Sequence, residues 1–191
     1  LLGRYLADQM SEVYSLQQHR KAFCLGNIMP DLRPSFLTTR HEFFGTFSQL
    51  QEKMRELIER NPEEDNARVY WRRFGEVMHY MADYFTFPHN RTYKGSLAEH
   101  NSYEAELKNC LKECILSGNA DSQLEEAKHF DSFEELVGYI RERHACYLES
   151  PRCIADDIRF ILRVCYQVIQ GIFQFCLRRQ FHMEGRPVTA I

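Results

Sequence analysis

The chain is organised around the segment Trp71-Arg-Arg-Phe-Gly-Glu-Val-Met-His79-Tyr-Met-Ala-Asp83-Tyr-Phe-Thr-Phe-Pro-His89, which is followed eleven residues later by His100-Asn-Ser-Tyr-Glu104. His79 and Asp83 are four positions apart, and so are His100 and Glu104. Residues four apart share one face of an α-helix. Each pair therefore offers two metal-ligating side chains from one rigid element.

Length and composition indicate a single globular domain. With 191 residues the chain is large enough for a single hydrophobic core, so we expect one domain over residues 1–191. Its 44% hydrophobic and 27% charged residues are ordinary for a globular protein. The net charge of −3 gives no reason to expect a stable nucleic-acid partner, because nucleic-acid-binding domains are usually basic. It does not exclude a nuclease, because bound metal ions would dominate the local field.

The seven cysteines are scattered and form no Cys-x-x-Cys pair. Several lie in apolar helical patterns, where a free cysteine behaves as a small hydrophobic residue. This argues against a disulfide framework and indicates a reducing compartment, so we expect a cytoplasmic protein. No signal-peptide pattern and no run of 18 apolar residues is visible. The sequence begins at Leu1 and not at Met, which leaves secretion open.

Helical periodicity is the only regular pattern in the sequence, so the predicted fold is all-α, a single-domain multi-helix bundle with a multi-zinc site. We expect one helix over residues 1–17 and another over 46–60. Between them, a loop around Pro30 and Pro34 is expected to hold Met29 and Arg33 in extended or turn conformations, because the residue before proline avoids helical angles. Residues 154–181 are apolar on more than one face and are expected to form the central helix of the core.

Start and stop signals place the candidate ligands on helices. A start within 61–64 or near Asn66 opens the helix that carries His79, and Pro88 ends it. Ser96 and Glu99 form a capping box at the start of the next helix. Two further starts are expected, one at Asp121 or Ser122 and one at Asp131.

Imidazole nitrogen and carboxylate oxygen are ligands that zinc accepts. The available donors are Asp31, His41, His79, Asp83, His89, His100 and Glu104. Seven donors are too many for one zinc ion and suit two, with a bridging carboxylate able to recruit another. On spacing alone, ordinary ion pairs between histidine and a neighbouring acid remain the alternative interpretation.

The same residues resemble a known signature. His79-x3-Asp83-x5-His89 followed by His100-x3-Glu104 resembles the zinc-dependent phospholipase C family, and Gly26-Asn-Ile-Met-Pro-Asp31 resembles the upstream Gly-x-x-x-Pro-Asp segment of that family. His41 stands where the family places its next histidine. The resemblance covers roughly residues 20–105. It implies an all-helical fold, which the family shares with zinc-dependent single-strand nucleases.

The resemblance also implies a division of labour among two to three zinc ions. One ion would be held by Asp31, His41, His79 and Asp83, and a second by His89, His100 and Glu104. Asp83 would bridge the first ion to a third, and Asp31 would be the catalytic general base beside the nucleophile. The implied reaction is hydrolysis of a phosphodiester by a metal-bound hydroxide that attacks phosphorus. The implied substrate is a phospholipid or another phosphodiester, with transient contact to a membrane surface.

The sequence departs from the family pattern at the third zinc, which the family completes with its N-terminal residue and an early histidine. We expect that histidine to lie upstream of Leu1; His19 is the alternative, and without either the site has two metals. Other functions remain open: a nuclease or phosphatase on the same scaffold, or a non-catalytic helical metal-binding protein. The sequence determines neither the head group nor the oligomeric state.

Overall fold

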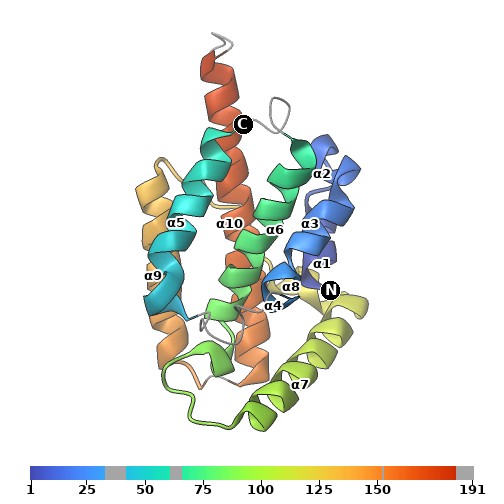
Figure 1. The fold of residues 1–191 in the computed structure, drawn as a ribbon, viewed down its shortest axis with the longest axis vertical. Helices are drawn as coiled ribbons and strands as arrows, with labels where there is room; N and C mark the ends of the chain where they lie inside the picture. The colour runs from blue at the N-terminus through green and yellow to red at the C-terminus, as the bar shows by residue number, and fades with distance from the viewer. Residues whose placement is uncertain (33–41, 61–65, 152, 184–191) are drawn as a thin grey trace.

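The computed structural model describes residues 1–32, 42–60, 66–151 and 153–183. Within these ranges the chain forms ten α-helices and a short 3-10 helix, and none of the described residues lies in a strand (Figure 1). The all-α prediction is therefore confirmed. The helices are α1 (Leu2–Gln9), α2 (Tyr14–Gln18), α3 (Arg20–Gly26), α4 (Met29–Leu32), α5 (Phe43–Glu59), α6 (Ala67–Tyr84), η2 (Phe87–His89), α7 (Leu97–Leu116), α8 (Asn119–Gln123), α9 (Phe133–Glu149) and α10 (Ile154–Met183).

Helix α10 runs along the middle of the bundle (Figure 1) and contacts α5, α6, α7, α8 and α9. This agrees with the prediction of a central core helix. Its segment Ile154–Phe181 is long and apolar enough to cross a membrane by length and composition, and 56% of the most apolar window is buried inside the structure. A buried core helix meets the same criterion, and the contacts of α10 account for its apolar faces.

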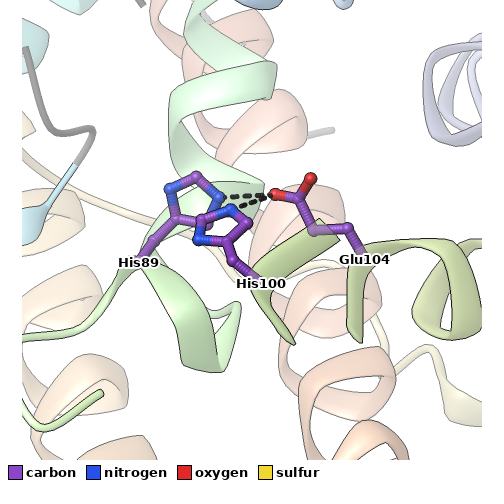
Figure 2. A group of neighbouring side chains, drawn as sticks. All are labelled: His89, His100 and Glu104. Atoms are coloured by element: carbon purple, nitrogen blue, oxygen red, sulfur yellow. Dashed lines mark hydrogen bonds and ion pairs between the residues drawn. The ribbon is translucent and has the colours of Figure 1, made fainter. Parts of the chain in front are cut away.

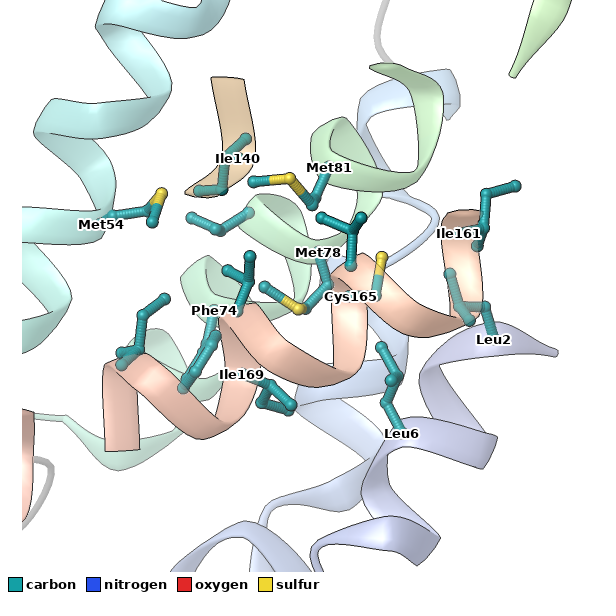
Figure 3. Close-up of a cluster of buried hydrophobic side chains, with 14 of the residues drawn as sticks. Leu2, Leu6, Met54, Phe74, Met78, Met81, Ile140, Ile161, Cys165 and Ile169 are labelled. Carbon is teal, nitrogen blue, oxygen red and sulfur yellow. The ribbon is translucent and has the colours of Figure 1, made fainter. Parts of the chain in front are cut away.

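The core is built between α6 and α10, as Figure 3 shows. Phe74, Met78 and Met81 of α6 are fully buried, and so are Cys165 and Ile169 of α10. Side chains from α1, α5 and α9 close the cluster from the sides; they include Leu2, Leu6, Met54 and Ile140. All seven cysteines are free thiols in this structure.

Helices α3 and α6 cross in backbone contact, because a glycine lies on each side of the crossing. A Cβ atom on Gly26 would lie 1.9 Å from the carbonyl oxygen of Arg72, and one on Gly75 would lie 2.1 Å from that of Phe23. Any side chain at either position would hold the helices further apart. This crossing places the end of α3, and α4 after it, directly against the middle of α6.

The N-terminal region differs from the sequence-based prediction in two places. The single helix expected over residues 1–17 is broken into α1 and α2. The break is stabilised by Gln17, whose Nε2 donates to the carbonyl oxygens of Ala7 at 2.8 Å and Met10 at 3.1 Å. Met29 is helical, and not extended or in a turn, since Pro30 occupies the first turn of α4, where a missing N–H leaves no hydrogen bond unmade. Arg33, the other residue of this prediction, lies outside the described residues.

Two predicted helix starts are also corrected. The start at Asp121 or Ser122 is wrong, because α8 already ends at Gln123. The segment after it is held by Gln167 of α10, whose Oε1 accepts from the N–H of Lys128 at 2.7 Å. The start at Asp131 is one residue early, because Ser132 caps α9. Helix α5 begins at Phe43, three residues before the predicted 46.

Candidate metal centre

The first group of candidate ligands is assembled on α6 and α4. Asn66 caps α6, and its side chain accepts a hydrogen bond from the N–H of Val69 at 3.3 Å. This confirms the predicted helix start near Asn66. His79 Nε2 lies 3.1 Å from Asp83 Oδ2 one turn later. It also lies 3.3 Å from Asp31 Oδ1 on α4. The helix crossing at Gly26 and Gly75 therefore brings a residue 48 positions upstream, Asp31, to the predicted pair.

The orientation of the His79 ring is set by the backbone of α3. His79 Nδ1 lies 3.1 Å from the carbonyl oxygen of Asn27. A carbonyl oxygen only accepts hydrogen bonds, so Nδ1 carries a proton and donates it. In the neutral ring this leaves the Nε2 lone pair directed toward the two carboxylates. Fixing the tautomer through the distal nitrogen is the usual support of a metal-binding histidine.

The surroundings of His79 favour a cation at Nε2. Burial lowers the pKa of this histidine, but the charge of Asp83 and the hydrogen bonds to Asp31 and Asp83 outweigh that effect and raise its pKa well above the ordinary value. A ring nitrogen and two carboxylate oxygens that face one another repel unless a positive charge lies among them. A second proton or a metal ion meets that requirement.

The second group lies between η2 and α7, as Figure 2 shows. Glu104 Oε1 lies 2.9 Å from His89 Nε2 and 2.9 Å from His100 Nε2. Their three ligand atoms all lie within 4.8 Å of one another. The predicted capping box is present, with both reciprocal hydrogen bonds between Ser96 and Glu99, and it fixes the first turn of α7 on which His100 stands.

In this second group, which we call the triad (His89, His100 and Glu104), neighbouring charges shift the pKa values of Glu104 and His89. Burial raises the pKa of Glu104, but the hydrogen bonds and charges of His89 and His100 together outweigh burial and lower the pKa below its ordinary value. Burial lowers the pKa of His89, and the charges of Asp83 and Glu104 reverse this to a net rise. The triad thus holds an ionised carboxylate against two imidazoles.

Asp83 connects the two groups. Its Oδ2 lies 3.1 Å from His79 Nε2 and 4.0 Å from His89 Nδ1. Of the predicted donors, the structure therefore brings together Asp31, His79, Asp83, His89, His100 and Glu104. The seventh, His41, lies outside the described residues. His19 lies between α2 and α3, where its Nδ1 is 2.9 Å from the carbonyl oxygen of Ser15.

The donor types of these residues suit zinc. The donors are imidazole nitrogen and carboxylate oxygen, and bond lengths of about 2.0–2.2 Å imply separations of about 3.3 Å between ligand atoms around a tetrahedral ion. In the group of His89, His100 and Glu104, the carboxylate oxygen lies 2.9 Å from each imidazole nitrogen, and all three ligand atoms lie within 4.8 Å of one another. Among the described residues, this group has the spacing of a metal site.

The backbone carbonyl that supports His79 was not predicted from the sequence. The carbonyl of Asn27 fixes the His79 tautomer, yet every residue type offers a carbonyl oxygen, so no local signal marks this one. The two glycines at the helix crossing, Gly26 and Gly75, were the sequence signal that could have indicated this contact. Gly26 belongs to the segment already noted for its resemblance, and Gly75 lies one turn before His79.

Comparison with known proteins identifies the family of this chain. The sequence profile of the family described as zinc dependent phospholipase C matches residues 1–154, which is most of the chain and includes all seven predicted donors. Neither the curated proteins nor the solved structures give a significant match. From the extent of the profile match, the chain belongs to the zinc-dependent phospholipase C family and is a zinc-dependent phosphodiesterase.

Proposed function

We propose that this protein hydrolyses the bond between the glycerol and phosphate groups of a phospholipid. The family implies the phospholipid class of substrate. The single observation that carries the proposal is the convergence of two His–carboxylate groups on Asp83, whose Oδ2 lies 3.1 Å from His79 and 4.0 Å from His89. Paired cation sites a few ångströms apart are the arrangement suited to phosphoryl transfer.

In this proposal Asp31, His79 and Asp83 would hold one zinc ion together with His41, and the triad would hold a second. Zinc in these positions would acidify a water molecule and neutralise charge on the phosphoryl oxygens. A third ion beside Asp83 belongs to the same proposal. The role of the chain is to hold its donors in place, through the Asn27 carbonyl for His79 and the capped first turn of α7 for His100.

Asp31 is the proposed proton acceptor. Its side chain is 53% exposed, whereas those of His79 and Asp83 are 8% and 13% exposed. It is therefore the most accessible to solvent of these three side chains. Its Oδ1 contacts His79 Nε2 at 3.3 Å, so one carboxylate can both face the metal position and take a proton from water.

An aromatic groove between α5 and α9 favours a lipid over a nucleic acid. A cavity of about 430 Å³ is lined by residues of α5 and α9 that include Phe43, Phe44, Phe47 and Leu148. His144 in its wall bonds Asn90, the residue after His89, with 3.3 Å between Nε2 and Oδ1. A mainly apolar groove suits an acyl chain, and the net charge of −3 does not favour a polyanion.

Metal content and a substrate panel test the proposal. Protein purified without chelators should contain two or three zinc ions per chain. It should hydrolyse phosphatidylcholine or phosphatidylinositol vesicles and a chromogenic phosphodiester faster than single-stranded DNA. Near-zero zinc after gentle purification would refute the assignment. Preferred cleavage of DNA would support the nuclease alternative, and bound zinc without any hydrolysis would support a non-catalytic protein.

Replacing Asp83 by asparagine tests the division of the ligands. Asp83→Asn should abolish hydrolysis and remove zinc from the His79 group, while the triad keeps its ion. Asp131→Asn is the matched control, because Asp131 also lies beside a histidine, 3.4 Å from His129, but on an exposed surface. It should change neither zinc content nor activity. Loss of all zinc from Asp83→Asn would contradict the assignment of two separate groups.

A further inference from the structure

A carboxylate that belongs to neither group of ligands lies buried beneath the triad. Asp157 stands in the first turn of α10 and is fully buried, with 0% of its surface exposed. It lies beyond residues 1–154, the part that matches the family profile. Burying an acid in a protein core is costly unless several donors compensate its charge.

The donors to Asp157 come from three different elements. Its Oδ2 accepts from the backbone N–H of Phe87 at 2.9 Å and from the hydroxyl of Tyr103 at 2.9 Å. Its Oδ1 accepts from the hydroxyl of Tyr147 on α9 at 2.6 Å. These bonds satisfy the carboxylate, and they also tie η2, α7 and α9 to the start of α10.

Two of these three elements carry the triad. Phe87 is the first residue of η2, two positions before His89, and Tyr103 immediately precedes Glu104 on α7. One oxygen atom, Asp157 Oδ2, therefore holds both halves of the triad. The rings of Phe87 and Tyr103 also touch edge to face, with centroids 6.0 Å apart. The third element, α9, carries none of the described ligands.

The triad depends on the distance between η2 and α7, since His89 comes from one and Glu104 from the other. Metal ligands must be held within about 0.5 Å of their productive positions. Hydrogen bonds to a charged acceptor are short and directional, so they define that distance more sharply than apolar contacts do. An apolar side chain in place of Asp157 would fill space without fixing the position of either donor.

We propose that Asp157 is a positioning residue that sets the separation of η2 and α7 and thereby the zinc affinity of the triad. This inference rests on the proposed function, because it assumes that the triad binds zinc. It assigns to the start of α10 a part in the metal centre, although α10 contributes no ligand to the described groups.

Two tyrosine variants test the proposal with matched chemistry. Tyr103→Phe and Tyr147→Phe each remove one hydroxyl that donates to Asp157 and keep the ring. Only Tyr103 stands on a ligand-bearing element. Zinc binding to the chelator-treated full chain is measured by competition with a chromogenic chelator. The Glu104→Gln variant identifies the binding step that belongs to the triad, and the His79 step serves as an internal reference.

Tyr103→Phe should weaken the triad step about tenfold, the usual effect of losing a group that orients a ligand. Tyr147→Phe should leave that step within about twofold, although both variants lose stability through the missing hydrogen bond. Asp157→Asn should weaken the triad step by about 10- to 100-fold where it folds. The His79 step should stay unchanged in the two tyrosine variants.

The remaining outcomes overturn the proposal. Equal effects of the two tyrosine variants on the triad step, or no effect of either, would show that Asp157 does not position the triad. An equal loss at both zinc steps would show a merely structural role. A wild-type chain that binds no zinc would refute the proposed function as well, so the two failures are distinguishable.

Discussion

Replacing Gly26 by alanine tests whether the close crossing of α3 and α6 builds the first metal group. The added Cβ would lie 1.9 Å from the carbonyl oxygen of Arg72, whereas real Cβ atoms essentially never come within 3.0 Å of another heavy atom. The helices must therefore separate by at least about 1.1 Å, the difference between these distances. The obstructing atom belongs to the backbone of α6, so no side-chain rotation relieves the contact.

That separation is too large for the contacts of His79 with Asn27 and Asp31 to persist. His79 on α6 is bonded to the Asn27 carbonyl at 3.1 Å and faces Asp31 at 3.3 Å, and both partners follow Gly26 in the chain. An added ångström carries each contact beyond hydrogen-bonding distance. Overpacking of a core costs about 1–3 kcal/mol, and the lost buried hydrogen bond adds about 1 kcal/mol. We therefore expect Gly26→Ala to destabilise the protein by about 2–4 kcal/mol.

Urea unfolding followed by circular dichroism measures the stability, and zinc analysis of the folded variant measures the site. Gly138→Ala is the control, because Gly138 lies inside α9 and, apart from its own helix backbone and chain neighbours, no atom lies within 4 Å of where its Cβ would be. This change should stabilise the protein by about 0.5–1 kcal/mol, since alanine favours a helix interior over glycine. A Gly26→Ala protein with wild-type stability and zinc content would refute the link between the crossing and the site.

Two further predictions concern pH and helix capping. Burial lowers the pKa of His144 to about 4, so the stability that this residue contributes is present above pH 6.5 and is lost as pH falls through 4. In zinc-free protein the loss of unfolding free energy should reach about 2 kcal/mol after allowance for solvent screening. The His144→Phe variant should lack that part of the pH dependence when its unfolding is measured between pH 4 and pH 7. Stability profiles of the variant and the wild type that run parallel over this range would contradict the prediction. Ser96→Ala should cost about 1 kcal/mol and weaken zinc binding at the triad, because the capping box holds the turn that bears His100; thermal unfolding and zinc titration measure both, and an unchanged melting temperature would count against the cap.

Local chemistry made much of this structure predictable. The pairs His79–Asp83 and His100–Glu104 share helix faces because of the 3.6-residue turn, which depends only on sequence spacing. The start of α6 at Asn66 and that of α7 at Ser96 follow from side chains that accept hydrogen bonds from their own first turns. The errors arose where distant groups intervened, as when Gln167 of α10 holds the segment after α8 in a non-helical path.

The sequence by itself determined the donor types, their helical pairing and the family, because these depend on residue identity and on short-range hydrogen bonds. Only the tertiary structure decided which donors meet. Asp31 reaches His79 because two glycines allow α3 and α6 to touch, and His89 meets Glu104 where Asp157 holds η2 and α7 to the start of α10. These contacts join residues far apart in the chain. Their formation depends on how the whole core packs, which no local pattern specifies.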